Sequence, residues 1–260
     1  MRMAIAQYYP GSSVLHHFDP RAKIVAVTVV AVALFTRDAF RALAVYAALA
    51  AIGLVLSRVP PVWFWRGLRP VLWLIVLTFI AQVLFVPGEA FFRLGPIGLS
   101  WRGLELAGYL SLRLVVLVLV GSLLTLTTSP ISLTDGLAWL TRPLRALRVP
   151  TEELALMVTI ALRFIPTLLV ELEAIMRAQR ARGADFSHGG PVRRARSLVP
   201  VLVPLFVVSF RRADDLALAM EARCYVPGVR RSRLHPLRSG WADAVLLALV
   251  AAAVLAASLI

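Results

Sequence analysis

Apolar residues occur along the chain in long runs that are separated by short polar segments. A helix that crosses the hydrocarbon core of a bilayer needs about 20 apolar residues, with a range of about 17 to 25. Two shorter runs, at residues 24–36 and 42–57, flank a polar cluster and predict a tight helical hairpin. Runs of sufficient length occupy residues 70–88, 104–129 and 241–260. The pattern therefore predicts an all-α polytopic membrane protein with about five transmembrane helices.

The stretch between the last two expected spans has a different pattern, in which apolar positions recur at helical spacing among charged residues. None of its helices reads cleanly as a span. Arg163 interrupts the most apolar part of the second, where a charge costs about 2.5 to 3.5 kcal/mol at a bilayer centre. We expect that helix to lie along the membrane surface. Proline and glycine signals divide the stretch into helices at residues 132–147, 150–181 and 191–225.

These patterns predict a chain of three parts. Residues 1–129 hold an N-terminal tail and four transmembrane helices, residues 130–239 form a domain of long amphipathic helices, and residues 240–260 form the last transmembrane helix. An interior proline removes a helical hydrogen bond and crowds the preceding turn, so it bends a helix. The expected bends of the amphipathic helices are Pro166, Pro200 and Pro204.

The positive charges predict the orientation. The chain is 60% hydrophobic and carries a net charge of +14. With the N-terminus in the cytoplasm, 23 of the 28 basic residues lie on cytoplasmic segments, as the positive-inside rule favours. This topology explains the basic character without nucleic acid as a partner, and it predicts a multi-pass protein of the cell membrane. The single cysteine, Cys224, and four histidines without zinc-type spacing predict neither a disulfide nor a metal site.

The second and third amphipathic helices end alike. Residues 175–183 superpose on residues 216–224 after a shift of 41 positions, which places Arg182 on Arg223. An arginine in the last helical turn lies at the negative end of the helix dipole, and its guanidinium group can pair bidentately with an acidic partner. A single basic helix end is common, but two matching ends predict two matching sockets on a dimeric partner. The matching triplets are Ala181-Arg182-Gly183 and Ala222-Arg223-Cys224.

Three further segments accompany these helix ends. They are Gln7-Tyr-Tyr-Pro-Gly-Ser-Ser-Val-Leu-His-His-Phe-Asp-Pro-Arg-Ala-Lys23, Thr127-Thr-Ser-Pro-Ile-Ser-Leu-Thr-Asp-Gly136 and Ala161-Leu-Arg-Phe-Ile-Pro-Thr-Leu168. Together with the helix ends, these segments resemble the transmembrane T component of energy-coupling factor transporters, and the resemblance covers nearly the whole chain. The N-terminal segment is more similar to T components that are shared among several substrate-binding proteins.

This resemblance implies a non-catalytic subunit that works with two ABC-type ATPases and a substrate-binding S component in vitamin or metal-ion uptake. The long cytoplasmic helices would be coupling helices, and both triplets would dock into the ATPases through Arg182 and Arg223. Cys224 departs from the Ala-Arg-Gly pattern, and it disfavours a helix ending that needs a positive φ. No glycine-rich lysine loop is present and the only lysine is Lys23, so neither ATP nor another cofactor is expected to bind to this chain.

Other functions have weaker support. A self-sufficient secondary transporter needs intramembrane ionisable residues, and Arg113 is the main candidate, either linked to Glu105 or extended to the outer interface. A membrane enzyme acting on lipid or phosphate lacks a cluster of carboxylates or histidines. The sequence therefore favours a coupling subunit whose partners supply ATP hydrolysis and substrate binding.

Overall fold

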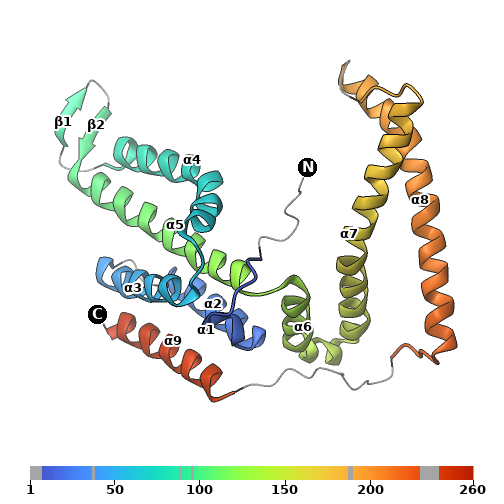
Figure 1. Ribbon diagram of the computed structural model, residues 1–260. Coiled ribbons are helices and arrows are strands. Elements are labelled where there is room, and N and C mark those ends of the chain that lie inside the picture. The colour runs from blue at the N-terminus through green and yellow to red at the C-terminus, as the bar shows by residue number, and fades with distance from the viewer. Residues whose placement is uncertain are drawn as a thin grey trace. The chain divides into compact units, whose positions relative to one another are not determined.

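The computed structural model describes residues 8–36, 39–87, 90–94, 97–186, 190–228 and 240–259. The chain forms two compact units, which are Met1–Leu140 with His235–Ile260, and Thr141–Leu234. Helices dominate both units, as Figure 1 shows. Of the polar cluster expected between the first two spans, Arg37 and Asp38 lie outside the described residues.

The first unit is built from seven helices and one short hairpin among its described residues. The hairpin pairs its two strands antiparallel and joins α4 to α5, and the sequence pattern did not predict it. The elements are α1 (Val14–His17), α2 (Pro20–Ala33), α3 (Phe40–Ser57), α4 (Pro61–Phe85), β1 (Ala90–Leu94), β2 (Ile97–Ser100), α5 (Trp101–Thr127), α6 (Pro130–Leu140) and α9 (Trp241–Leu259).

The core of this unit lies where α2, α3, α5 and α9 meet. Its largest buried side chains include Leu34, Leu43 and Val116. Small residues let helix backbones approach closely, which is how helices associate in a membrane where lipid is as apolar as a leucine side chain. Gly53 shows this directly, because a Cβ there would lie 2.8 Å from a methyl carbon of Leu123.

Five helices among the described residues are long and apolar enough to cross a membrane, namely α3, α4, α5, α7 (Thr151–Ala181) and α9. The expected number and the all-α fold are confirmed, but the set differs from the expected one. The run at residues 24–36 yields the helix α2 of only 14 residues. The expectation that no helix between residues 130 and 239 reads as a span is wrong for α7 (Thr151–Ala181), which qualifies by length and composition despite Arg163.

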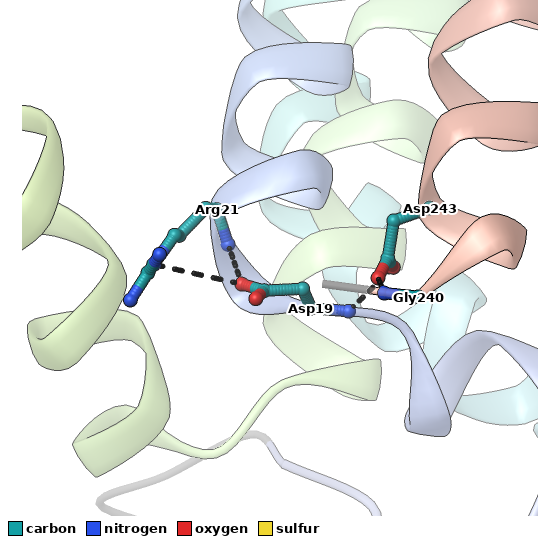
Figure 2. A network of polar contacts seen from close by, with 4 residues as sticks. All are labelled: Asp19, Arg21, Gly240 and Asp243. Atoms are coloured by element: carbon teal, nitrogen blue, oxygen red, sulfur yellow. Dashed lines mark hydrogen bonds and ion pairs between the residues drawn. The ribbon is translucent and has the colours of Figure 1, made fainter. Parts of the chain in front are cut away.

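A buried polar cluster joins the first helices to the last one, and Figure 2 shows its centre. The backbone N–H of Asp19 donates to Oδ1 of Asp243 at 2.7 Å, across 224 positions of sequence. The other carboxylate oxygen of Asp243 accepts from the N–H of Gly240 at 2.7 Å. The Asp19 side chain caps α2 by accepting from the N–H of Arg21 at 2.8 Å. One carboxylate therefore fixes both the start of α2 and the start of α9.

Lys23 extends this cluster to the end of α5. Its ammonium group donates to the carbonyl of Thr127 at 3.1 Å and to the hydroxyl of Thr128 at 3.2 Å. Lys23 precedes the run at residues 24–36, and burial lowers its pKa to about 8, although the carboxylates of Asp243 and Asp19 act to raise it. We call Asp19, Lys23 and Asp243, which are all buried, the polar knot.

The beginning of α2 also packs against α6. The guanidinium group of Arg21 lies over the ring of Trp139, 4.6 Å from its centre. Gly136 lets α6 approach α2, because a Cβ at this position would lie 2.9 Å from a methyl carbon of Ile24. These contacts explain why α6 belongs to the first unit, whereas the sequence placed residues 130–140 with the amphipathic helices.

We expect Asp243→Ala to lower the free energy of unfolding by about 3 kcal/mol. The substitution leaves two backbone N–H groups without their acceptor and removes a countercharge from buried Lys23. Thermal unfolding of the purified protein in detergent measures the effect. Asp215→Ala on an exposed face is the control. Equal unfolding temperatures for the two variants would show that the polar knot does not stabilise the fold.

Candidate functional site

The second unit is an antiparallel pair of long helices preceded by a short one. It contains η1 (Arg142–Leu147), α7 and α8 (Pro191–Ala222). Figure 1 shows α7 and α8 side by side. An ion pair between Arg212 and Glu171 at 2.7 Å joins their middle parts. The N–H of Gly228, beyond the end of α8, donates to a carboxylate oxygen of Glu153 at 2.9 Å. These bonds fix which part of α7 faces which part of α8.

Both long helices begin where the sequence predicted. Pro150 precedes α7, whose first turn carries Glu152 and Glu153 at the positive end of the helix dipole. Arg145 of η1 forms an ion pair with Glu152 and donates to the hydroxyl of Thr151 at 3.1 Å. The predicted helix at residues 132–147 is instead divided into α6 and η1, since Thr141 and Pro143 interrupt it.

The end of α7 is closed by backbone hydrogen bonds of the Schellman type. The N–H of Gly183 donates to the carbonyl of Arg180 at 2.9 Å, and the N–H of Ala184 donates to the carbonyl of Gln179 at 3.0 Å. Gly183 adopts a φ of +87°, which the turn requires. A Cβ there would meet no atom within 4 Å, so backbone conformation alone favours glycine. Arg182 is the last residue before this turn.

The end of α8 repeats the same turn 41 residues later. The N–H of Cys224 donates to the carbonyl of Glu221 at 2.8 Å, and that of Tyr225 donates to Met220 at 2.9 Å. Cys224 adopts a φ of +56° although it has a side chain. The sequence predicted that Cys224 disfavours a helix ending with a positive φ. The structure nevertheless forms this ending, and it places Cys224 in a strained backbone conformation. Arg223 occupies the position of Arg182.

The structure separates the two helix ends. Gln179, near the end of α7, contacts Pro200 of α8, whereas Arg223 lies at the far end of α8. At 1.5 Å per residue, the helix from Pro200 to Arg223 is about 35 Å long. The residues of both triplets, Ala181-Arg182-Gly183 and Ala222-Arg223-Cys224, are exposed. The two arginines therefore suit two separate acceptor sites, because one compact site could not contact both.

The three predicted bend residues all lie inside helices, with Pro166 in α7 and Pro200 and Pro204 in α8. Pro204 cannot donate to the carbonyl of Pro200, which is four residues earlier. The side-chain amide of Gln179 donates to that carbonyl instead, at 3.3 Å. Gln179 was not predicted from the sequence, although two prolines one turn apart indicate a carbonyl that lacks its helical donor.

Arg113, the candidate for a transport pathway, is buried in the first unit among aromatic rings. Its guanidinium group lies 4.5 Å from the ring centre of Phe35 and 5.5 Å from that of Tyr109. Its relative exposure is 8%, so the side chain does not extend to an interface, and Glu105 is exposed. Cation–π contacts of this kind stabilise a buried guanidinium group. They give Arg113 a structural role inside the helix bundle.

The apolar helices and the unit with two exposed basic helix ends define a multi-pass membrane subunit. Residues 11–235 match the model of the CbiQ family, described as cobalt transport protein. Among similar proteins is the energy-coupling factor transporter transmembrane protein EcfT of Thermosediminibacter oceani, 50% identical over 93% of this chain and 91% of that protein. EcfT of Thermanaerovibrio acidaminovorans is 49% identical over 97% and 94% of the two chains. EcfT of Brevibacillus brevis is 44% identical over 94% and 92%.

The chain therefore belongs to the CbiQ family and, within it, to the transmembrane components of energy-coupling factor transporters. The predicted family is confirmed, and the protein is a non-catalytic transporter subunit. The docking role of the two triplets is not part of this identification and stays a prediction.

We expect Cys224→Gly to stabilise the end of α8 by about 1 kcal/mol, because glycine adopts a φ of +56° without the steric cost of a side chain. Gly183→Ala is expected to destabilise the end of α7 by a similar amount. Hydrogen exchange of the amides at residues 183–184 and 224–225 measures both effects, slower for the first variant and faster for the second.

Gly190→Ala is the matched control, since Gly190 has a φ of −69° and a Cβ there would meet no atom within 4 Å. If Cys224→Gly left exchange at residues 224–225 unchanged, the positive φ of Cys224 would not be a source of strain.

Proposed function

We propose that this chain is the coupling subunit that links ATP hydrolysis by two partner ABC-type ATPases to vitamin or metal-ion uptake through a substrate-binding S component. The observation that carries the proposal is the pair of matching helix ends, each with an exposed arginine, at opposite ends of one antiparallel helix pair. Two copies of the same type of helix end, about 35 Å apart along a helix, suit two ATPase subunits of similar structure. The chain binds no ATP itself.

The geometry of each end fits docking into a groove. A guanidinium group beside the carbonyl end of a helix dipole is held in place electrostatically and can form two hydrogen bonds to one carboxylate. The neighbouring alanines, Ala181 and Ala222, leave room for close approach. The backbone turn at Gly183 and at Cys224 ends each helix abruptly, so Arg182 and Arg223 project at the ends. Movement of the ATPases would then act on two stiff helices.

The sides of the same helices support contact with apolar partners. α8 leaves a row of large apolar side chains exposed between its charged ends, which suits the bilayer surface and a membrane-embedded S component. The charges support a cytoplasmic N-terminus and cytoplasmic ends of α7 and α8, with α7 lying along the membrane surface, although its length and composition would also allow it to span the membrane. Pro166, Pro200 and Pro204 would be the bends through which the coupling helices adjust. The exposed apolar residues of α8 include Val199, Leu202, Val203, Phe206 and Phe210.

We expect reversal of both charges, Arg182→Glu with Arg223→Glu, to abolish copurification of the ATPases and to reduce uptake to background. Each substitution places a carboxylate at the position where an acidic site on the ATPase would bind a guanidinium group, and the two negative charges repel each other. Affinity purification of the assembled complex and uptake of labelled substrate by cells measure the two effects.

Arg177→Glu with Arg211→Glu is the matched control, because these exposed arginines lie at least one turn before the ends and outside both triplets. The control is expected to assemble. Full assembly and uptake by the Arg182→Glu, Arg223→Glu protein would contradict the docking role.

The single cysteine offers a direct test of orientation, since Cys224 is exposed. We expect a membrane-impermeant maleimide to label Cys224 in inside-out vesicles and to leave it unlabelled in intact spheroplasts. Cys224→Ser gives the background in both preparations. Labelling in intact spheroplasts would place the end of α8 outside the cell and overturn the topology.

A further inference from the structure

A side-chain hydrogen bond connects the end of α7 to the proline pair of α8. Nε2 of Gln179 lies 3.3 Å from the carbonyl oxygen of Pro200. Because a carbonyl oxygen only accepts hydrogen bonds, the amide nitrogen of Gln179 must face it. Gln179 also belongs to the turn that ends α7, since its own carbonyl accepts from the N–H of Ala184 at 3.0 Å. One residue therefore takes part in both the helix end and the contact between helices.

The acceptor exists because of proline chemistry. In a regular helix the N–H of residue 204 would donate to the carbonyl of residue 200, but Pro204 has no N–H. The carbonyl of Pro200 can therefore accept a hydrogen bond from outside its own helix, and an interior proline is a known cause of helix bends. Gln179 uses this capacity, so the position of the α7 end is tied to the conformation of α8 at its proline pair.

The repeat shows that this contact is specific to one of the two ends. A shift of 41 residues carries Gln179 to Met220, whose thioether cannot donate a hydrogen bond. The chain beyond α8 is instead joined to the start of α7 through Gly228 and Glu153. Each end of the helix pair thus has its own polar link to the neighbouring helix, and the ion pair of Glu171 with Arg212 lies between the two links.

We propose that Gln179 is a positioning residue for energy coupling, which holds the Arg182 end against the proline pair of α8 and thereby fixes the spacing of the two arginine ends. This inference rests on the proposed function, because the spacing matters when each end occupies a separate ATPase. Movement at one end then changes the other end, since α7 and α8 move as one pair. Loss of the contact leaves both arginines in place and weakens only the mechanical connection between them.

The spacing is measured with two spin labels on the full chain in lipid nanodiscs. Cys224 carries one label near the end of α8, and Ala174→Cys, on an exposed face of the last turns of α7, carries the other. Pulsed electron spin resonance gives the distribution of distances. Gln179→Met, which keeps the length and removes the donor, is expected to broaden the distribution. An unchanged distribution would overturn the proposal.

A double-mutant cycle identifies the hydrogen bond as the cause. Pro204→Ala supplies an N–H to the carbonyl of Pro200 within α8, so it is expected to weaken the contact by competition. Gln179→Met combined with Pro204→Ala should then broaden the distribution little more than either change alone. Pro166→Ala, a proline of α7 without this contact, is the control and should add to Gln179→Met. Additive effects of Gln179→Met and Pro204→Ala would overturn the proposal.

The functional readout is the number of ATP molecules hydrolysed per substrate imported by the reconstituted complex. Gln179→Met is expected to retain the ATPases and to raise this ratio about two- to tenfold, the range that loss of one hydrogen bond allows. A broadened distribution with an unchanged ratio would overturn the coupling role of Gln179. Absence of the ATPases from complexes of both the unaltered and the variant chain would instead refute the proposed function, while the spin-label measurement would still test the contact.

Discussion

Two buried charged groups, the carboxylate of Asp243 and the ammonium group of Lys23, hold helices from the beginning, middle and end of this chain together. The arrangement of the first unit depends on them. Helices that face lipid gain little from hiding apolar side chains, because lipid tails are as apolar as leucine. Polar contacts and small residues therefore decide which helices meet. The N–H of Asp19 reaches the carboxylate of Asp243, and Lys23 reaches the end of α5. A buried charge without its partner is costly, so α2, α5 and α9 are held in one arrangement.

The second unit is held by a different principle. Its two long helices are joined by polar contacts at three levels, and two of these involve groups at or near helix ends. The first N–H groups and the last carbonyl groups of a helix have no hydrogen-bond partners within the helix, so their partners must come from outside it. Here those needs are met by turns that leave Arg182 and Arg223 exposed. The pair thus combines two long helices with two matching ends, the form on which the proposed coupling role is based.

Much of the local structure could be predicted from the sequence. The starts of α7 and α8 were predicted to within a residue, since proline and acidic residues mark the start of a helix, and the end of α7 was located equally well. The 41-residue repeat identified both exposed arginines. The matching turns explain it, because one backbone geometry ends both helices. Cys224 was the weakest element of this prediction, because the surrounding helix end imposed a positive φ that its side chain disfavours.

Hydrophobic pattern and charge alone determined that this chain is a helical membrane protein with two basic helix ends, because both properties depend on residues close together in sequence. Tertiary structure decided the rest. The partners of Lys23 and Asp243 lie on helices far away in sequence, and α6 joins the first unit through Arg21, Trp139 and Gly136. Gln179 finds its acceptor only because antiparallel packing brings it beside Pro200. Side chains at such distances become neighbours through folding, so no local pattern could have revealed them.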